Sequence, residues 1–112
     1  MASANAHKAL EIAEILTDHD IEPRPRDLGE VVEDEKTLEG NARLKAVAVC
    51  ARTGVPAVAD DTGLEVDALG GLPGVRSARF AGESATDAEN LAKLLDVMRE
   101  IPESKRTARF RT

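Results

Sequence analysis

Aromatic side chains are almost missing from this chain of 112 residues, which has two phenylalanines and no tryptophan or tyrosine. Its core must therefore be filled by Leu, Val, Ile and Ala. A single cysteine, Cys50, excludes an internal disulfide. No apolar run approaches the roughly 20 residues of a membrane-spanning helix, and no signal-segment pattern opens the chain. We therefore expect a protein of the reducing cytoplasm without membrane contact.

Positive charge is also scarce, since 15 Lys and Arg face 21 Asp and Glu and leave a net charge of -6. Nucleic-acid backbones are held by clustered Lys and Arg. We therefore expect no nucleic-acid partner. Any phosphate bound here must be held locally, by a few cations or by a metal ion.

The composition, 42% hydrophobic and 32% charged, is that of a globular domain, and the length suits one domain over residues 1–112. Three helices are expected. The first has Ala9, Ile12, Ala13 and Leu16 at helical spacing. The second spans Thr37 to Arg52, and its apolar stripe is formed by Leu44, Val47, Ala48 and Ala51. The third opens with a capping box, Thr86 and Glu89, and carries the stripe Leu91, Leu94, Leu95 and Met98.

Strands are expected between these helices, which makes the fold class α/β. Residues 57–60 form a short apolar run typical of a buried strand, and residues 64–68 alternate as a half-exposed strand does. Residues 22–36 are rich in proline and acid, and we expect a loop there with one short strand. Residues 107–112 alternate again and predict a further strand.

The stretch AVADDTG, residues 57–63, places two carboxylates, Asp60 and Asp61, where the predicted strand enters a turn. An α/β protein can build a magnesium site in this way. Successive strand side chains point to opposite faces, so one acid looks into a given crevice, and we choose Asp61, nearer the turn. The alternative is turn chemistry alone, because Asp, Thr and Gly all favour turns.

Both ends of the chain suggest a larger domain. A phosphate-binding loop normally leaves a strand and enters a helix, but only Met1 and Ala2 precede residues 3–8, SANAHK. The strand predicted from Thr107 is also short, because the sequence ends at Thr112. We expect the N-terminal part of a larger α/β domain. The alternative is a complete small domain with a frayed tail at residues 107–112.

Several segments together resemble the inosine/xanthosine triphosphate pyrophosphatases. These are SANAHK, GNARLKA at 40–46, PAVADDTGLEVDALGG followed by PGVRSARFAGE within residues 56–83, ATDAENLAKLL and IPESKRTARF. The resemblance implies a three-layer fold with a mixed central sheet. It also implies hydrolysis of deaminated purine nucleoside triphosphates (ITP, dITP, XTP) to monophosphate and pyrophosphate, with Mg²⁺, by a homodimer.

The resemblance also assigns substrate-binding residues. Ser3, Asn5 and Lys8 match the family's triphosphate-binding loop, with Lys8 as a point charge on phosphate oxygens. Asn41 matches a polar residue of the family's second helix, and Thr62 a hydroxyl residue that contacts substrate.

Three further matches carry the chemistry. Glu33 and Asp61 are the implied metal ligands, and Asp61 is also the implied general base. Magnesium prefers few carboxylates and keeps several waters. Lys45 is expected to offset charge on the phosphates during cleavage. The alternatives are that Glu33 belongs to a solvated acidic loop and that Lys45 only extends along a helix flank.

The sequence departs from the family pattern at a few positions. Ala4 and His7 stand where the phosphate loop usually has glycines, and Gly40 stands where a glutamate is common. The family's purine-clasping segments match nothing up to Thr112. We therefore expect at most weak, base-indifferent binding of nucleoside triphosphates by this chain. An inactive fragment with only weak nucleotide, metal or partner binding is the alternative function.

Overall fold

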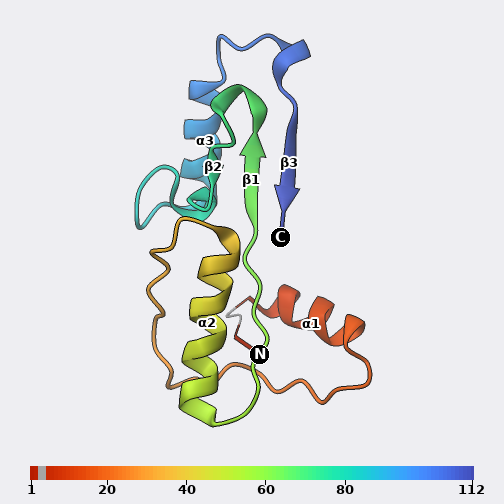
Figure 1. Ribbon diagram of the computed structural model, residues 1–112. Helices are drawn as coiled ribbons and strands as arrows, with labels where there is room; N and C mark the ends of the chain where they lie inside the picture. The colour runs from red at the N-terminus through yellow and green to blue at the C-terminus, as the bar shows by residue number, and fades with distance from the viewer. Residues whose placement is uncertain (3–4) are drawn as a thin grey trace. The chain divides into compact units, whose positions relative to one another are not determined.

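The computed structural model describes residues 1–2 and 5–112, which divide into two compact units, Met1–Asp61 and Thr62–Thr112. Figure 1 shows helices in both units and strands in the second. The α/β class is confirmed. None of the helices among the described residues has the length and hydrophobicity needed to cross a bilayer.

Two helices build the first unit, and side-chain caps fix where they start. Helix α1, Ala6–Ile15, follows Asn5, whose side-chain oxygen accepts a hydrogen bond from the backbone N of His7. Helix α2, Leu38–Thr53, follows Thr37, whose hydroxyl accepts from the backbone N of Gly40 at 3.0 Å. Capping of this kind satisfies amides that have no partner in the first turn. Both predicted helices are confirmed, and α2 is displaced by one residue.

The buried face of α2 differs from the predicted stripe. Leu38, Asn41 and Val49 are the buried residues of this helix, whereas Val47 is 57% exposed. With Lys45, the buried residues are spaced by three, four and four positions and so form one line along the helix. The predicted stripe is therefore wrong at Val47 and Ala51, which are exposed, whereas Leu44 and Ala48 are half-buried. Asn41 and Lys45 lie within the inward face, because both side chains make polar contacts there.

An extended segment follows α2 and runs back beside the N-terminus (Figure 1). The backbone N of Ala2 donates to the carbonyl of Val58 at 2.9 Å, and both Met1 and Ala2 are buried. The predicted strand at residues 57–60 is thus extended and half-buried, but it is not a strand of a sheet. The predicted short strand within residues 22–36 is also not found, because this described segment is loop.

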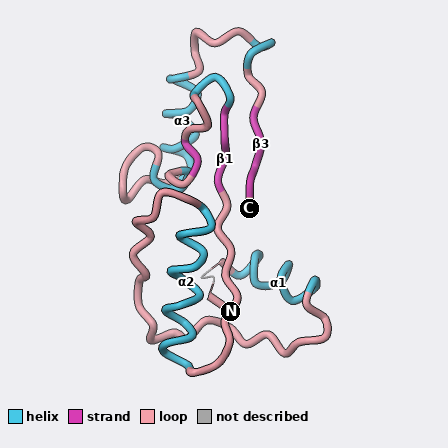
Figure 2. Tube along the Cα trace, in the orientation of Figure 1, coloured by secondary structure: helices cyan, strands magenta, loops and turns pink. Residues whose placement is uncertain are grey.

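The second unit contains a three-stranded antiparallel sheet with strand order β2-β1-β3. Its strands are β1, Gly63–Val66, β2, Pro73–Gly74, and β3, Ala108–Arg111. Figure 2 shows β1 and β3 side by side, with Leu64 opposite Phe110 and Val66 opposite Ala108. The two strands predicted in this unit are confirmed with shorter bounds, since residues 67–69 form a 3₁₀ turn. A larger mixed sheet stays a prediction.

Strand β3 has different chemistry on its two faces. The guanidinium groups of Arg109 and Arg111 lie 3.9 and 3.7 Å from the carboxylate of Glu65 on β1. Phe110, between them, points to the other face and is 79% exposed.

Helix α3, Asp87–Val97, begins with the capping box that the sequence predicts. The backbone N of Thr86 donates to the Glu89 carboxylate at 2.7 Å, and the backbone N of Glu89 donates to the Thr86 hydroxyl at 3.2 Å. The predicted stripe is buried only in part, because Met98 is buried whereas Leu91 and Leu95 are exposed. The apolar side of α3 is therefore only partly covered.

Asp67 ties the end of β1 to the residue that precedes β3. Its carboxylate accepts hydrogen bonds from the Thr107 hydroxyl at 2.6 Å and from the Arg109 guanidinium at 2.8 Å. The Thr107 bond and then the Arg109 bond and charge lower the pKa of Asp67 below its ordinary value of 3.8. A lowered folded-state pKa stabilises the fold above pH 3.8, and this contribution is lost as the pH falls through the folded-state value.

We predict that Thr107→Val raises the pKa of Asp67 toward 3.8, because it removes the largest cause of the shift. A carboxyl-carbon NMR titration measures this directly. Thr17→Val, at an exposed turn of the first unit, should leave the titration of Asp67 unchanged. An identical Asp67 titration in Thr107→Val and the parent chain would contradict the assignment.

Candidate functional site

Two lysines and three carboxylates of the first unit form paired groups near the end of the extended segment. Lys8, on α1, places its Nζ 2.7 Å from Oδ2 of Asp60. Lys45, on α2, places its Nζ 3.1 Å from Oε1 of Glu33 and 3.6 Å from Oδ1 of Asp61. The neighbouring acids Asp60 and Asp61 thus reach different lysines, as expected for successive residues of an extended chain.

All five side chains are partly shielded from water. Their exposed fractions lie between 15% for Lys45 and Asp61 and 27% for Lys8 and Glu33. Charge interactions are screened less at such positions than on an open surface. Two carboxylates close to one another repel, so the Lys45 ammonium allows Glu33 and Asp61 to converge.

Asn41 and Gly40 dock the acidic loop on α2, one turn before Lys45. The side-chain oxygen of Asn41 accepts from the backbone N of Glu35 at 3.0 Å, and Asn41 is only 1% exposed. A Cβ built on Gly40 would lie 2.7 Å from the Cβ of Glu35, closer than real Cβ contacts come. The loop therefore approaches the helix closely because residue 40 is glycine, which explains why a glutamate does not stand there.

The structure brings some predicted site residues together and gives others different surroundings. Glu33, Lys45 and Asp61 form one group. Asn5 caps α1, and Asn41 holds the acidic loop, so a direct contact of either with substrate stays a prediction. Ser3 lies outside the described residues.

Thr62 belongs to the second unit, as does Arg79 of the segment SARF, residues 77–80, within the family-like stretch. The Thr62 hydroxyl lies 2.9 Å from that of Thr112, and Nε of Arg79 lies 3.7 Å from the Glu83 carboxylate. A substrate contact of Thr62 stays a prediction.

Sequence reasoning left the role of Asp60 open and missed the role of Gly40. The signal for Asp60 was its place next to Asp61, combined with a lysine on the first helix. The signal for Gly40 was a glycine in a helix start that directly follows an acidic loop.

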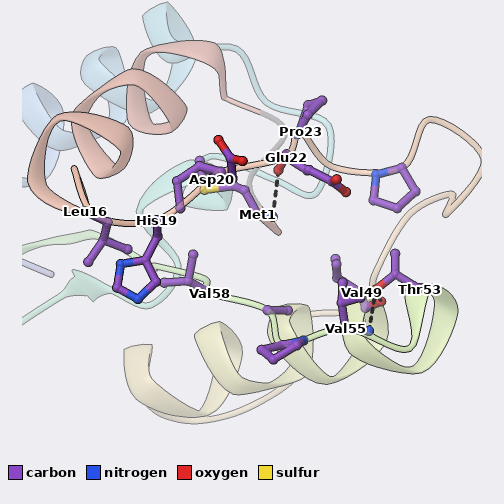
Figure 3. A pocket seen from close by; sticks show the side chains of 14 residues that line it. Met1, Leu16, His19, Asp20, Glu22, Pro23, Val49, Thr53, Val55 and Val58 are labelled. Atoms are coloured by element: carbon purple, nitrogen blue, oxygen red, sulfur yellow. Dashed lines mark hydrogen bonds between the residues drawn. The ribbon is translucent and has the colours of Figure 1, made fainter.

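A separate hollow of about 430 Å³ lies in the same unit (Figure 3). Leu16, Val49 and Val58 contribute apolar walls, and the hydroxyl of Thr53 donates to the carbonyl of Val49 at 2.8 Å. Neither lysine of the paired groups lines it. The hollow is therefore separate from the two lysines.

Comparison with known proteins identifies the family. The model of the Ham1 family matches residues 1–112. The chain belongs to the Ham1 family. The resemblance inferred from the sequence is confirmed, since curated relatives bear the name dITP/XTP pyrophosphatase. One from Vibrio parahaemolyticus is 48% identical, with 98% of this chain and 56% of the relative covered. One from Salmonella paratyphi A is 47% identical, with 98% and 57% covered.

Solved Ham1 structures agree with this assignment. A Ham1 protein from Coxiella burnetii matches with a TM-score of 0.84 and 40% identity, over 97% of this chain and 57% of that one. The Ham1 protein of Staphylococcus aureus matches with a TM-score of 0.81 and 37% identity, over the same shares. The chain thus spans a little more than half the length of the Ham1 relatives it matches.

The donor set of this Ham1 chain suits magnesium better than a softer metal. Glu33 and Asp61 direct hard oxygen atoms toward one cation, the Lys45 ammonium. Among the described residues there is no group of three or more His, Cys, Asp or Glu that could hold a metal ion. Mg²⁺ is commonly bound by one or two carboxylates and retains waters, so two converging carboxylates fit it.

We predict that Gly40→Ala destabilises the protein by about 1–3 kcal/mol, because the added methyl group collides with the acidic loop. At an unhindered helix position the same change stabilises by up to about 1 kcal/mol, so the expected sign is the reverse of the ordinary one. Urea unfolding followed by circular dichroism measures the difference. Arg43→Ala, at an exposed position of the same helix, is the control. A Gly40→Ala protein that is more stable than the parent would refute the close-packing argument.

Proposed function

We propose that this protein hydrolyses deaminated purine nucleoside triphosphates, dITP, ITP and XTP, to the monophosphate and pyrophosphate and so clears them from the nucleotide pool. One observation carries the proposal: the Lys45 ammonium lies between the carboxylates of Glu33 and Asp61, in the unit that also pairs Lys8 with Asp60. The names of the curated relatives support the substrate class.

The start of α1 suits the phosphate tail of such a substrate. Amide groups of a helix's first turn and the helix dipole attract anions. Lys8 lies in that first turn and adds a positive charge, which Asp60 holds at 2.7 Å. Asn5 and Ser3 precede this turn, and we propose that they contribute polar contacts to the same phosphates.

Asp61 and Lys45 serve the bond cleavage in this proposal. The carboxylate of Asp61 orients the attacking water and accepts its proton, as a general base does. The ammonium of Lys45 offsets negative charge on the phosphates as the bond between the α and β phosphates breaks. Glu33 and Asp61 would hold Mg²⁺, which when bound neutralises charge on the phosphate oxygens.

Asn41 and Thr62 complete the proposed substrate-binding set. Asn41 acts at least through the acidic loop, because its amide fixes the backbone at Glu35, two residues from Glu33. We further propose that the protein acts as a homodimer in the cytoplasm. The family resemblance supports the dimer, and the single cysteine suits a reducing compartment. The net charge of -6 supports a nucleotide substrate held locally over a nucleic-acid polymer.

We predict that Asp61→Asn lowers the rate of pyrophosphate release from dITP with Mg²⁺ by about 10²- to 10⁴-fold, the usual contribution of a general base. Asp18→Asn, in the exposed turn after α1, makes the same chemical change elsewhere and should retain the parent rate. Unchanged pyrophosphate release from Asp61→Asn would overturn the proposed chemistry.

Binding of ITP and GTP by the parent chain distinguishes the alternative function. An active pyrophosphatase releases pyrophosphate from dITP and ITP in excess of GTP, an outcome that would overturn the weak, base-indifferent binding expected from the sequence. Equal weak binding of ITP and GTP without pyrophosphate release would instead identify an inactive nucleotide-binding chain.

A further inference from the structure

The Lys45 ammonium lies within 4 Å of both carboxylates that we propose as magnesium ligands. Its Nζ is 3.1 Å from Oε1 of Glu33 and 3.6 Å from Oδ1 of Asp61. These are the oxygen atoms that a divalent cation would need. A lysine ammonium and a metal ion carry charge of the same sign, so they cannot share the space between the two carboxylates.

We propose that Lys45 is a built-in competitor of the divalent cation at Glu33 and Asp61, and that a polyphosphate relieves the competition by drawing the ammonium onto its own oxygens. The inference rests on the proposed function, because that function makes the two carboxylates metal ligands. It adds that the metal and the nucleotide bind cooperatively at this site.

The surroundings of Lys45 support a side chain that can change partners while its backbone stays in place. Helix α2 is capped by Thr37, buried at Val49 and tied to the acidic loop by Asn41. The ammonium, by contrast, ends a flexible stem of four carbons and binds as a point charge with three donors. It can therefore turn from carboxylate to phosphate oxygens without any movement of the helix.

Burial makes the competition strong enough to matter. Lys45 and Asp61 are each 15% exposed and Glu33 is 27% exposed, so water screens these charges less than on an open surface. Thermodynamic linkage then requires reciprocity: if the polyphosphate raises the affinity for metal, the metal raises the affinity for polyphosphate by the same factor, typically about 5- to 150-fold.

The test is a titration of Mn²⁺, a spectroscopic substitute for Mg²⁺, into nucleotide-free protein with detection by electron paramagnetic resonance. Lys45→Met and Lys45→Gln remove the competing charge, and we expect each to bind Mn²⁺ about 10- to 100-fold more tightly than the parent. Lys45→Arg keeps the charge and should bind as weakly as the parent. Lys36→Met, an exposed lysine of the acidic loop, changes the net charge equally and should not tighten binding.

Adding Asp61→Asn to Lys45→Met should abolish the gain, which ties the metal to the proposed ligands. Equal affinity of the parent, Lys45→Met and Lys45→Gln, with each fold verified by circular dichroism, would overturn the competition. So would tight binding that survives Asp61→Asn. In either case, pyrophosphate release by the parent would still support the proposed function. Conversely, if Lys45→Met binds Mn²⁺ tightly and the parent releases no pyrophosphate, only the proposed activity is refuted.

Discussion

The central constraint on the first unit is that like charges must be gathered in a place partly closed to water. Glu33 and Asp61 converge although both are acids, and an acid-rich chain with net charge -6 does not favour this by itself. Lys45 makes the arrangement possible, and Lys8 does the same for Asp60. Removing one partner of such a shielded group leaves a charge uncompensated, which costs more than losing a surface pair.

Helix α2 is the platform that presents this chemistry. Gly40 lets the acidic loop come close, Asn41 fixes its backbone, and Lys45 meets its carboxylate one turn later. Asn41 and Lys45 are four positions apart and so share one side of the helix, whereas Gly40 is the chain neighbour of Asn41 in the first turn. A helix face usually reserved for apolar packing is used here for polar contacts, with Leu38 and Val49 providing burial at its two ends.

Much of the fold could be predicted from local signals. Thr37 and the pair Thr86 and Glu89 mark helix starts through chemistry that acts within a few residues, and both starts are found. The strand expected at residues 57–60 depended on pairing partners far along the chain, which periodicity does not reveal. The buried face of α2 was misjudged because a hydrophobic pattern cannot foresee that an amide and an ammonium turn inward to meet an acidic loop. For the site, the resemblance supplied Glu33, Lys45 and Asp61, whereas their convergence depends on how the loop, the helix and the extended segment pack in three dimensions.

Strand β3 divides charge and apolar surface between its two faces. The side chain of Phe110 is largely exposed to water. An exposed apolar side chain on an outer strand favours association with another chain. Its neighbours Arg109 and Arg111 project from the opposite face. The strand therefore offers an approaching chain fixed charge on one face, where Glu65 and Asp67 hold the two guanidinium groups, and an apolar ring on the other.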